Sequence, residues 1–371
     1  MRKKQIVPYG SWKSPITADL VGSGTTGIGK IFVDEDDIYW IETRPSDGGR
    51  NVIVRHNSNE RNNDVTPKPY DVCTRVHEYG GGEYIVVDGN VYFLNSTDQS
   101  LYHQMFGSLP ELVISERNMR YADLVFDSVR NRIICVREDH NHSINEVTNT
   151  LASISVSHDD DIKHSEIITE GEDFYSSPRI SPDGSTLAWI SWNHPNMPWD
   201  GTDVWVANIH NDGSIGKPEH IAGALNESIS QPEWSPEGIL HFISDRSGWW
   251  NIYRRLQGET QSLKEMEVEF GVPQWVFGQS TYAFISSCEI ACTYTKNGKW
   301  FLAIMNTKTE EIKTIGSPYS NLSNVKTKQG DLIFIAGSPT EPSTIFQLNS
   351  DDKKLKIIQY KQLIFLRNQQ H

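Results

Sequence analysis

The sequence has little of several features that would direct it to particular functions. Its 371 residues include only four cysteines, too few for a disulfide framework. No apolar run approaches the roughly 18 residues that a transmembrane helix needs. Lys and Arg number 34 against 48 Asp and Glu, which leaves a formal net charge of −14 without any long basic block. We therefore expect neither nucleic acid nor an anionic membrane as a partner.

The amino terminus is basic but lacks the apolar segment of a signal peptide. Pro8, Tyr9 and Gly10 follow the basic residues 2–4 almost at once. With few cysteines and no targeting segment, we expect a cytoplasmic protein. Cys288 and Cys292 lie four residues apart without a second Cys/His pair, so we expect no bound metal and no cofactor.

An internal repeat is the most informative feature. The phrase Pro-Arg-Ile-Ser-Pro-Asp-Gly at residues 178–184 recurs as Pro-Glu-Trp-Ser-Pro-Glu-Gly at 232–238, and an apolar run follows each copy. A shorter copy, Pro-Gln-Trp at 273–275, precedes Phe-Ile-Ser at 284–286. With weaker copies, the repeat gives seven anchors at intervals of 42 to 54 residues: Trp40, Phe93, Cys135, Trp189, Phe242, Phe284 and Phe334. A period of this length built from strands is typical of propeller blades.

Each repeat reads as four strands. A turn such as Asp183-Gly184 separates the first strand from a second that is rich in Ile, Trp and Phe, and a third and a more polar fourth follow. We therefore predict an all-β fold, a seven-bladed β-propeller of four-stranded antiparallel blades, because stacked blades bury both faces of each sheet. The best helical candidate is residues 261–270, and no strand–helix alternation supports a doubly wound α/β fold.

The predicted propeller covers residues 18–360. An N-terminal extension (1–17) precedes it, and a C-terminal tail (361–371) follows. The expected blades are approximately 26–66, 77–115, 120–170, 175–223, 230–270, 274–316 and 321–359. An insertion at 192–201 interrupts the fourth blade between its second and third strands. Loops on one face of a propeller are the usual place for binding sites.

Motifs for nucleotide binding, hydrolysis and calcium binding are incomplete. Residues 22–27 spell G-x-G-x-x-G and 24–30 match G-x-x-x-x-G-K, but Ile31 and a strand-like segment follow instead of a hydroxyl residue and a helix. The nearest fragment to the G-x-S-x-G elbow of an α/β-hydrolase, at 278–282, lacks its second glycine. The acidic runs at 34–37 and 159–161 lack the spacing of a calcium loop. The sequence therefore offers no catalytic residue.

Two segments are candidate binding surfaces. The first, residues 75–82, combines charged and aromatic side chains with three glycines that allow close backbone approach. The second is the proline-braced insertion, which either presents a recognition surface or only plugs the blade edge. The candidate binding residues are Arg75, His77, Glu78, Tyr79, His194 and Trp199.

Five phrases form a set that covers most of the chain. They are Tyr-Gly-Ser-Trp-Lys-Ser-Pro-Ile at 9–16, the glycine-rich segment at 75–82, the insertion at 192–200, Asp-Arg-Ser-Gly-Trp-Trp-Asn at 245–251 and Pro-Gln-Trp-Val-Phe-Gly at 273–278. Together they resemble the amino-terminal propeller of the prolyl oligopeptidase family of serine peptidases, in its acylaminoacyl-peptidase or dipeptidyl-peptidase-like branch. The resemblance covers residues 8–360. The Ser-Pro-Asp-Gly phrase alone is less specific, since propellers similar to TolB carry it too.

The resemblance implies a function in peptide hydrolysis. In that family the propeller covers the active site of a carboxy-terminal α/β-hydrolase domain, restricts access to short peptides and helps to select the chain end that is cleaved. The catalytic triad belongs to the hydrolase domain. This chain ends at His371, so we expect a propeller truncated before the catalytic domain and inactive alone. The expected partners are a hydrolase domain or a second copy, with short peptides as ligands. The alternative is a stand-alone interaction scaffold similar to TolB or WD-repeat propellers.

Overall fold

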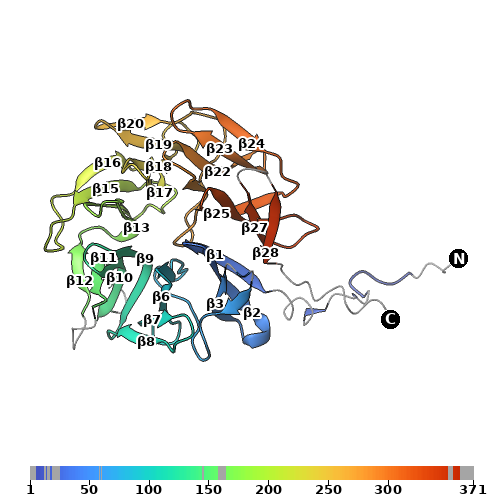
Figure 1. Ribbon diagram of the computed structural model, residues 1–371, viewed down its shortest axis with the longest axis horizontal. Coiled ribbons are helices and arrows are strands. Elements are labelled where there is room, and N and C mark those ends of the chain that lie inside the picture. Colours follow the sequence, from blue (N-terminus) through green and yellow to red (C-terminus); the bar gives the residue numbers. More distant parts are fainter. Residues whose placement is uncertain are drawn as a thin grey trace.

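Seven four-stranded sheets form a ring in the computed structural model (Figure 1). The structure describes residues 6–11, 14, 17–18, 26–57, 59, 61–143, 146–157, 164–349 and 354–359. Within each sheet the strands are antiparallel and neighbours follow one another in the sequence. The predicted seven-bladed β-propeller is confirmed.

The blades follow one another along the chain. Blades one and two are β1 (Gly27–Asp34), β2 (Asp37–Arg44), β3 (Arg50–His56), β4 (Asn62–Asp64) and β5 (Tyr84–Val87), β6 (Asn90–Leu94), β7 (Leu101–Met105), β8 (Glu111–Ile114). Blades three and four are β9 (Met119–Asp127), β10 (Arg132–Ser143), β11 (Glu146–Ser155), β12 (Glu166–Thr169) and β13 (Phe174–Ile180), β14 (Thr186–Trp192), β15 (Asp203–Asn208), β16 (Glu219–Gly223).

Blades five and six are β17 (Ile229–Trp234), β18 (Leu240–Ser244), β19 (Asn251–Leu256), β20 (Glu259–Ser262) and β21 (Tyr282–Phe284), β22 (Glu289–Lys296), β23 (Lys299–Asn306), β24 (Ile312–Ile315). Blade seven is β25 (Asn321–Lys328), β26 (Asp331–Gly337), β27 (Thr344–Leu348), β28 (Leu355–Gln359). A single turn of 3-10 helix, Pro45–Asp47, joins β2 to β3.

The core lies between neighbouring blades. Ala188 and Ile190 of β14 pack in one cluster with Leu240 and Phe242 of β18, so the second strand of each of these blades is covered on both sides. Nearly continuous apolar runs are expected in such strands. The fourth strands lie at the outside, and β24 has no buried residue. Burial is thus greater in the second strands than in the outer fourth strands. This difference explains why the second strands give the clearest repeat signal in the sequence.

Two sequence predictions are wrong in detail. Phe284 lies in the first strand of blade six, β21, and Cys292 occupies the middle of the second strand, β22. Cys292 is as small as the anchor Cys135, whereas Phe284 stands in the phrase Phe-Ile-Ser, so the repeat pattern selects Phe284 although it lies one strand before the equivalent position. Residues 261–270 form no helix, because Val268 and Phe270 are buried in the core between blades five and six. No helix in the described ranges is long and apolar enough to cross a bilayer.

The glycine-rich motif at residues 22–30 is described only in part. Residues 22–25 lie outside the described residues. The strand expected after Lys30 is present as the second half of β1, which pairs with β2. A strand at this point cannot supply the helix amino terminus that a phosphate-binding loop requires.

A β-bulge recurs in the innermost strands. The ladders of β13, β17 and β25 each shift register at a residue with a positive φ, and a charged residue follows two positions later. The pairs are Ser177 (φ 53°) with Arg179, Gln231 (φ 43°) with Glu233, and Asn324 (φ 53°) with Lys326. Bulges redirect the side chains beside them. In these three blades the bulge therefore places one charged side chain at the level of the central cavity.

Side chains join the first blade to the last. Ile31 and Trp40 of blade one share a core cluster with Ile333 and Ile345 of blade seven. At the outer edge, Asn62 donates a hydrogen bond from Nδ2 to Oε1 of Gln359 over 2.7 Å. Among the described strands, none is shared between the two sheets. The ring is therefore closed by packing and side-chain hydrogen bonds.

Candidate functional site

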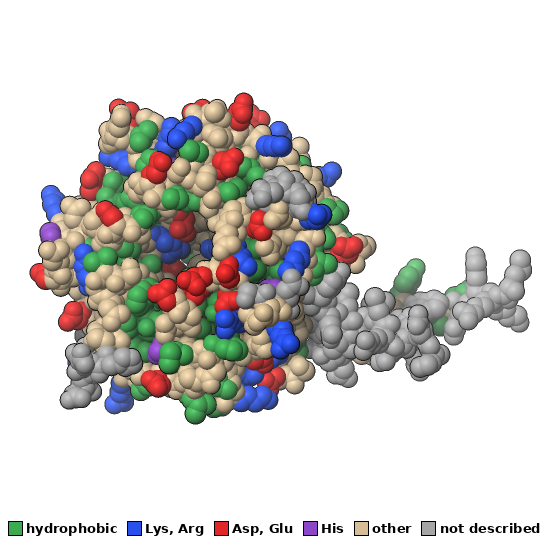
Figure 2. Space-filling view, viewed as in Figure 1, with side chains coloured by type: hydrophobic (Ala, Val, Ile, Leu, Met, Phe, Trp, Pro, Cys, Tyr) green, Lys and Arg blue, Asp and Glu red, His purple; other side chains and the backbone are tan. Residues whose placement is uncertain are grey.

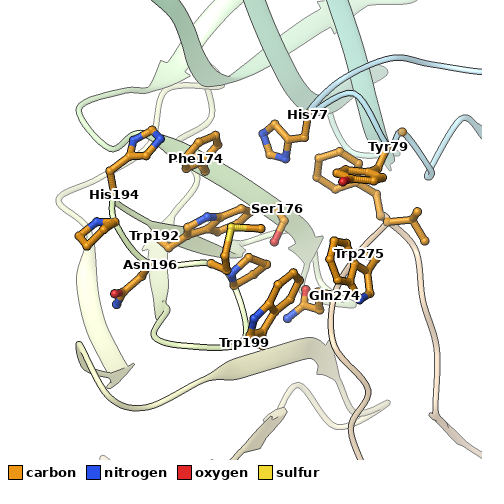
Figure 3. A pocket seen from close by; sticks show the side chains of 16 residues that line it. His77, Tyr79, Phe174, Ser176, Trp192, His194, Asn196, Trp199, Gln274 and Trp275 are labelled. Carbon is orange, nitrogen blue, oxygen red and sulfur yellow. The ribbon is translucent and has the colours of Figure 1, made fainter.

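A pocket of about 240 Å³ opens on one face of the ring (Figure 3). Three segments meet the start of β13 there: the connection between blades one and two, the loop from β14 to β15, and the connection between blades five and six. When strands alternate in direction, the loop after the second strand and the link to the next blade lie at the same end. The topology therefore brings these distant segments together.

Two stacked aromatic rings and an imidazole form one wall of the pocket. Phe174 stacks on Trp192 with centroids 5.3 Å apart, and His77 meets both rings edge-on at 5.1 and 5.6 Å. His77 also lies 4.9 Å from the ring of Phe277. Stacked and edge-on pairs of this kind are the favourable arrangements of aromatic groups. The wall is therefore rigid and mostly apolar.

Two indole rings and a phenol form the opposite wall. Trp199 and Trp275 have centroids 4.4 Å apart, and Tyr79 lies edge-on to Trp275 at 5.5 Å. Tyr79 is 62% exposed and Trp275 50% exposed. Large apolar side chains that remain this accessible around a concavity are typical of a binding surface. This wall is the more open side of the pocket.

The pocket also contains polar groups. Burial lowers the pKa of His77, so its imidazole is neutral at pH 7. The Asn149 side chain interacts with this imidazole, whereas the hydroxyl of Ser176 is buried and has no hydrogen-bond partner among the described residues. Buried polar atoms are normally hydrogen-bonded. Apolar walls with an unpaired polar group suit a ligand with an aromatic or aliphatic body and a polar end.

Hydrogen bonds hold the loop from β14 to β15 in place. The Asp173 carboxylate accepts hydrogen bonds from the backbone N–H and Nδ1 of His194, at 2.8 and 3.0 Å, which lower the pKa of Asp173. Asn196 donates to the carbonyl of Leu225 over 2.9 Å. The His194 ring also lies 4.9 Å from Phe174. These contacts fix the position of the loop beside the start of β13.

The glycines of the segment at 75–82 make the close approach that the sequence predicted. A Cβ atom on Gly81 would lie 2.5 Å from the carbonyl oxygen of Phe277, and one on Gly82 would lie 2.6 Å from Cα of Asp123. Both glycines have positive φ. Only glycine combines a positive φ with the lack of a Cβ atom at these close contacts. The two glycines therefore allow the segment to cross the connection between blades five and six.

The structure brings four of the six candidate residues together. His77, Tyr79, His194 and Trp199 line the pocket, whereas Arg75 and Glu78 do not. Glu78 is largely exposed and pairs with Arg120 at 2.8 Å. The sequence does not identify Phe174, Ser176, Trp275 and Phe277, which also line the pocket. Trp275 and Phe277 belong to the phrase at 273–278, but their position in a link between blades became visible only in the fold.

No cluster of three or more His, Cys, Asp or Glu side chains that could hold a metal is present in the described ranges. The four cysteines are free thiols.

Solved structures of peptidases share this fold over nearly the whole chain. A puromycin-hydrolyzing peptidase from Mycobacterium tuberculosis matches 96% of the chain with 31% sequence identity and a TM-score of 0.87. A puromycin hydrolase matches 96% with 28% identity and a TM-score of 0.87. The chain is a propeller of the prolyl oligopeptidase family. It spans 57% of the length of these two structures.

More distant members of the prolyl oligopeptidase family share the fold alone. A prolyl endopeptidase matches 94% of the chain with 11% identity and a TM-score of 0.70, and the chain covers 52% of its length. No family model matches the sequence, and no curated protein matches it at comparable significance. The assignment to the family therefore rests on the structural comparison.

Proposed function

We propose that the chain is the substrate-selecting propeller of a peptidase that acts on short peptides. In this proposal a hydrolase domain outside these 371 residues cleaves the peptide bond, since the sequence contains no G-x-S-x-G elbow. The observation that carries the proposal is the aromatic pocket on one face of a propeller whose relatives include puromycin-hydrolyzing peptidases. The candidates for substrates are therefore short peptides and puromycin.

The pocket's chemistry supports selection of an aromatic or large apolar side chain. Its walls are preorganised, so a ligand loses little of its binding free energy to ordering them. The Ser176 hydroxyl is the unpaired group that can form a hydrogen bond to the polar end of that ligand. In such a site, a peptide without an apolar side chain leaves the aromatic walls in contact with water. Selection between free and acylated peptide ends is part of the same proposal.

Activity assays test whether catalysis belongs to a hydrolase domain outside this chain. The purified chain is incubated with puromycin and with aminoacyl and acyl-aminoacyl p-nitroanilides, and we expect no turnover. Turnover that a serine-directed inhibitor abolishes would place the catalytic serine within this chain and overturn that part of the proposal.

Binding assays test the selection. Titration with phenylalanyl-glycine should quench tryptophan fluorescence, whereas glycyl-glycine should not, because only the first ligand can contact the indole rings of Trp199 and Trp275. Equal responses to both dipeptides would contradict an aromatic subsite. A pull-down from the cells of origin separates the alternatives: an α/β-hydrolase identified by mass spectrometry supports the peptidase, and a complex without one supports a scaffold.

We also propose that the isolated chain self-associates or requires a partner. Tyr79, Met197, Trp275 and Val276 are exposed around the same pocket. Exposed apolar side chains that cluster in this way favour association. A monomer in light scattering at micromolar concentration would count against this proposal.

A further inference from the structure

A second cavity lies at the centre of the ring and has charged walls. It measures about 340 Å³ and is lined by the innermost strands, with Lys30, Arg179 and Lys326 as cations and Asp123 and Glu233 as anions. Figure 2 shows basic and acidic side chains gathered in the central hollow. The lining thus has one more cation than anion. The pocket described above shares none of these five residues.

The two carboxylates of the cavity are bound to the same arginine. Arg179 donates from Nε to Oε1 of Glu233 over 3.1 Å, and its Nη1 lies 3.6 Å from Oδ1 of Asp123. Asp123 also accepts a hydrogen bond of 2.6 Å from the backbone N–H of Ser177. Arg179 is therefore compensated by its two neighbours.

Among the described residues, neither lysine has a counterion at bonding distance. Lys30 donates from Nζ to the backbone carbonyl of Tyr84 over 3.3 Å and lies over its ring. For Lys326, the described part of the chain provides neither a hydrogen bond nor an ion pair to the ammonium group. An ammonium group enclosed in protein without a counterion is costly, so these positions favour an incoming anion.

Electrostatics of the surrounding groups agree with that conclusion. Burial, against the attraction of Glu233 and Asp123 and with the repulsion of Lys30 and Arg179, lowers the pKa of Lys326 to about 8. Burial also lowers the pKa of Lys30, against the attraction of Glu83, Asp123 and Glu233. Glu83 does not line the cavity, and burial raises its pKa. The nearby carboxylates therefore offset the desolvation of the two lysines only in part, and among the described residues none of them forms an ion pair with Lys30 or Lys326.

The backbone fixes this arrangement. The bulge in β25 places Lys326 at the level of Arg179 and Glu233, and Lys30 lies at the register shift of β1. Gly278 keeps the space beside Lys30 open, since a Cβ atom there would lie 3.3 Å from Nζ. The lysines are thus presented to a volume that can accommodate a small ligand.

We propose that this cavity binds a small oxyanion, the carboxylate of a short peptide or an inorganic phosphate, between the ammonium groups of Lys30 and Lys326. The ligand's negative charge supplies the counterion that both lysines lack, and its oxygen atoms accept their hydrogen bonds. The site is independent of the aromatic pocket, so it can exist whether or not the proposed peptidase function is correct.

Calorimetry on the full chain at pH 7 and low salt tests the proposal with three probes: glycyl-glycine, glycyl-glycine amide and sodium phosphate. We expect the dipeptide, phosphate or both to bind, and the amide to bind at least about tenfold more weakly than the acid. Binding of phosphate alone identifies phosphate as the source of the oxyanion, and binding of the dipeptide acid identifies the peptide. If no probe binds, or if acid and amide bind equally without phosphate binding, the proposal is wrong.

Two variants locate the site. Lys326→Met should weaken binding of the active probe by about tenfold or more, whereas Lys313→Met, on the exposed strand β24, should not change it. In the unaltered chain the affinity should fall more steeply between pH 7 and 9 than in the methionine variant, because Lys326 loses its proton near pH 8 and only Lys30 is left in the variant. Equal binding by both variants would overturn the assignment.

Thermal unfolding distinguishes a ligand site from a structural ion pair. If Lys326 is an uncompensated ammonium group, the Lys326→Met variant should have an unchanged or raised Tm without ligand. A saturating concentration of the probe should raise the Tm of the unaltered chain. The same concentration should raise the Tm of the variant by less. A variant that unfolds at a lower temperature without ligand would show that Lys326 serves as a structural counterion, and would contradict the proposal.

Discussion

The indole rings of Trp199 and Trp275 lie with their centroids 4.4 Å apart, although 75 positions of sequence separate them. Trp199 lies in the insertion of blade four, and Trp275 belongs to the link between blades five and six. Their contact spans the inner edge of blade five on the pocket's face. One wall of the pocket is therefore formed jointly by blade four and by the link between blades five and six.

Replacing Trp199 should impair ligand binding more than folding. Trp199→Ala removes an aromatic pair worth about 1 kcal/mol and opens one wall of the pocket. We expect binding of phenylalanyl-glycine to weaken about tenfold. The free energy of unfolding should change by less than about 2 kcal/mol, since Trp199 is only partly buried. Trp249→Ala is the matched control, because Trp249 is 40% exposed and lies outside the pocket.

Alanine at Gly81 should destabilise the propeller strongly. The new Cβ would lie 2.5 Å from the Phe277 carbonyl oxygen, and φ is +100°, so both a clash and backbone strain oppose it. We expect a loss of about 3 kcal/mol or more in urea unfolding. Gly89→Ala separates the two causes, since Gly89 also has positive φ but no atom within 4 Å of its Cβ position. It should cost about 1 kcal/mol. Similar losses for both variants would contradict the close-approach argument.

Asp127 should be a strong stability determinant of blade three. Its carboxylate is fully buried and pairs with Arg130 at 3.2 Å and Arg132 at 3.0 Å. Asp127→Asn leaves two arginines without their counterion, and we expect a loss of about 3 kcal/mol in chemical denaturation. Glu341→Gln, at an exposed position, should change the stability by less than about 0.5 kcal/mol. A near-neutral Asp127→Asn would show that solvent already screens these pairs.

Stability should fall in acid partly through His241. Burial lowers the pKa of this imidazole to about 4 from its ordinary value of 6.5, and its Nδ1 donates to the carbonyl of Ile239 over 3.0 Å. Below pH 6.5 the unfolded chain takes up a proton that the folded chain does not accept until about pH 4. Acidification therefore favours unfolding by up to about 3 kcal/mol across that window.

Unfolding measurements at several pH values test the role of His241. The loss of stability between pH 6.5 and 4 should be smaller in His241→Gln than in the unaltered chain. The exposed His220→Gln should behave like the unaltered chain. Parallel pH profiles for all three proteins would show that other groups cause the acid sensitivity.

Much of the fold could be predicted from the sequence because the second strands have a recognisable pattern of large apolar residues. Trp40, Phe93, Trp189 and Phe242 are large, buried and regularly spaced. Cys292 performs the same packing with a small side chain, so the pattern shifted to Phe284 in blade six. The bulges were not predictable either, because Ser177 takes a positive φ that its residue type does not indicate.

The pocket could be predicted only in part. His194 and Trp199 were recognisable because an insertion rich in Pro and Trp stands out from a repeat. Trp275 and Phe277 were not, since their relation to His77 exists only after seven blades have closed into a ring. A site formed by three segments far apart in the chain leaves no spacing pattern in the sequence.

The closure between the first and last blades has a mechanical consequence. The six other junctions are each bridged by a covalent peptide link, whereas Ile31 and Ile333 meet across this seam through packing, and Asn62 reaches Gln359 through a hydrogen bond. A pulling force applied across this seam would meet no strand ladder among the described residues. Under tension the ring should open first between blades one and seven. The remaining blades should then unfold one after another.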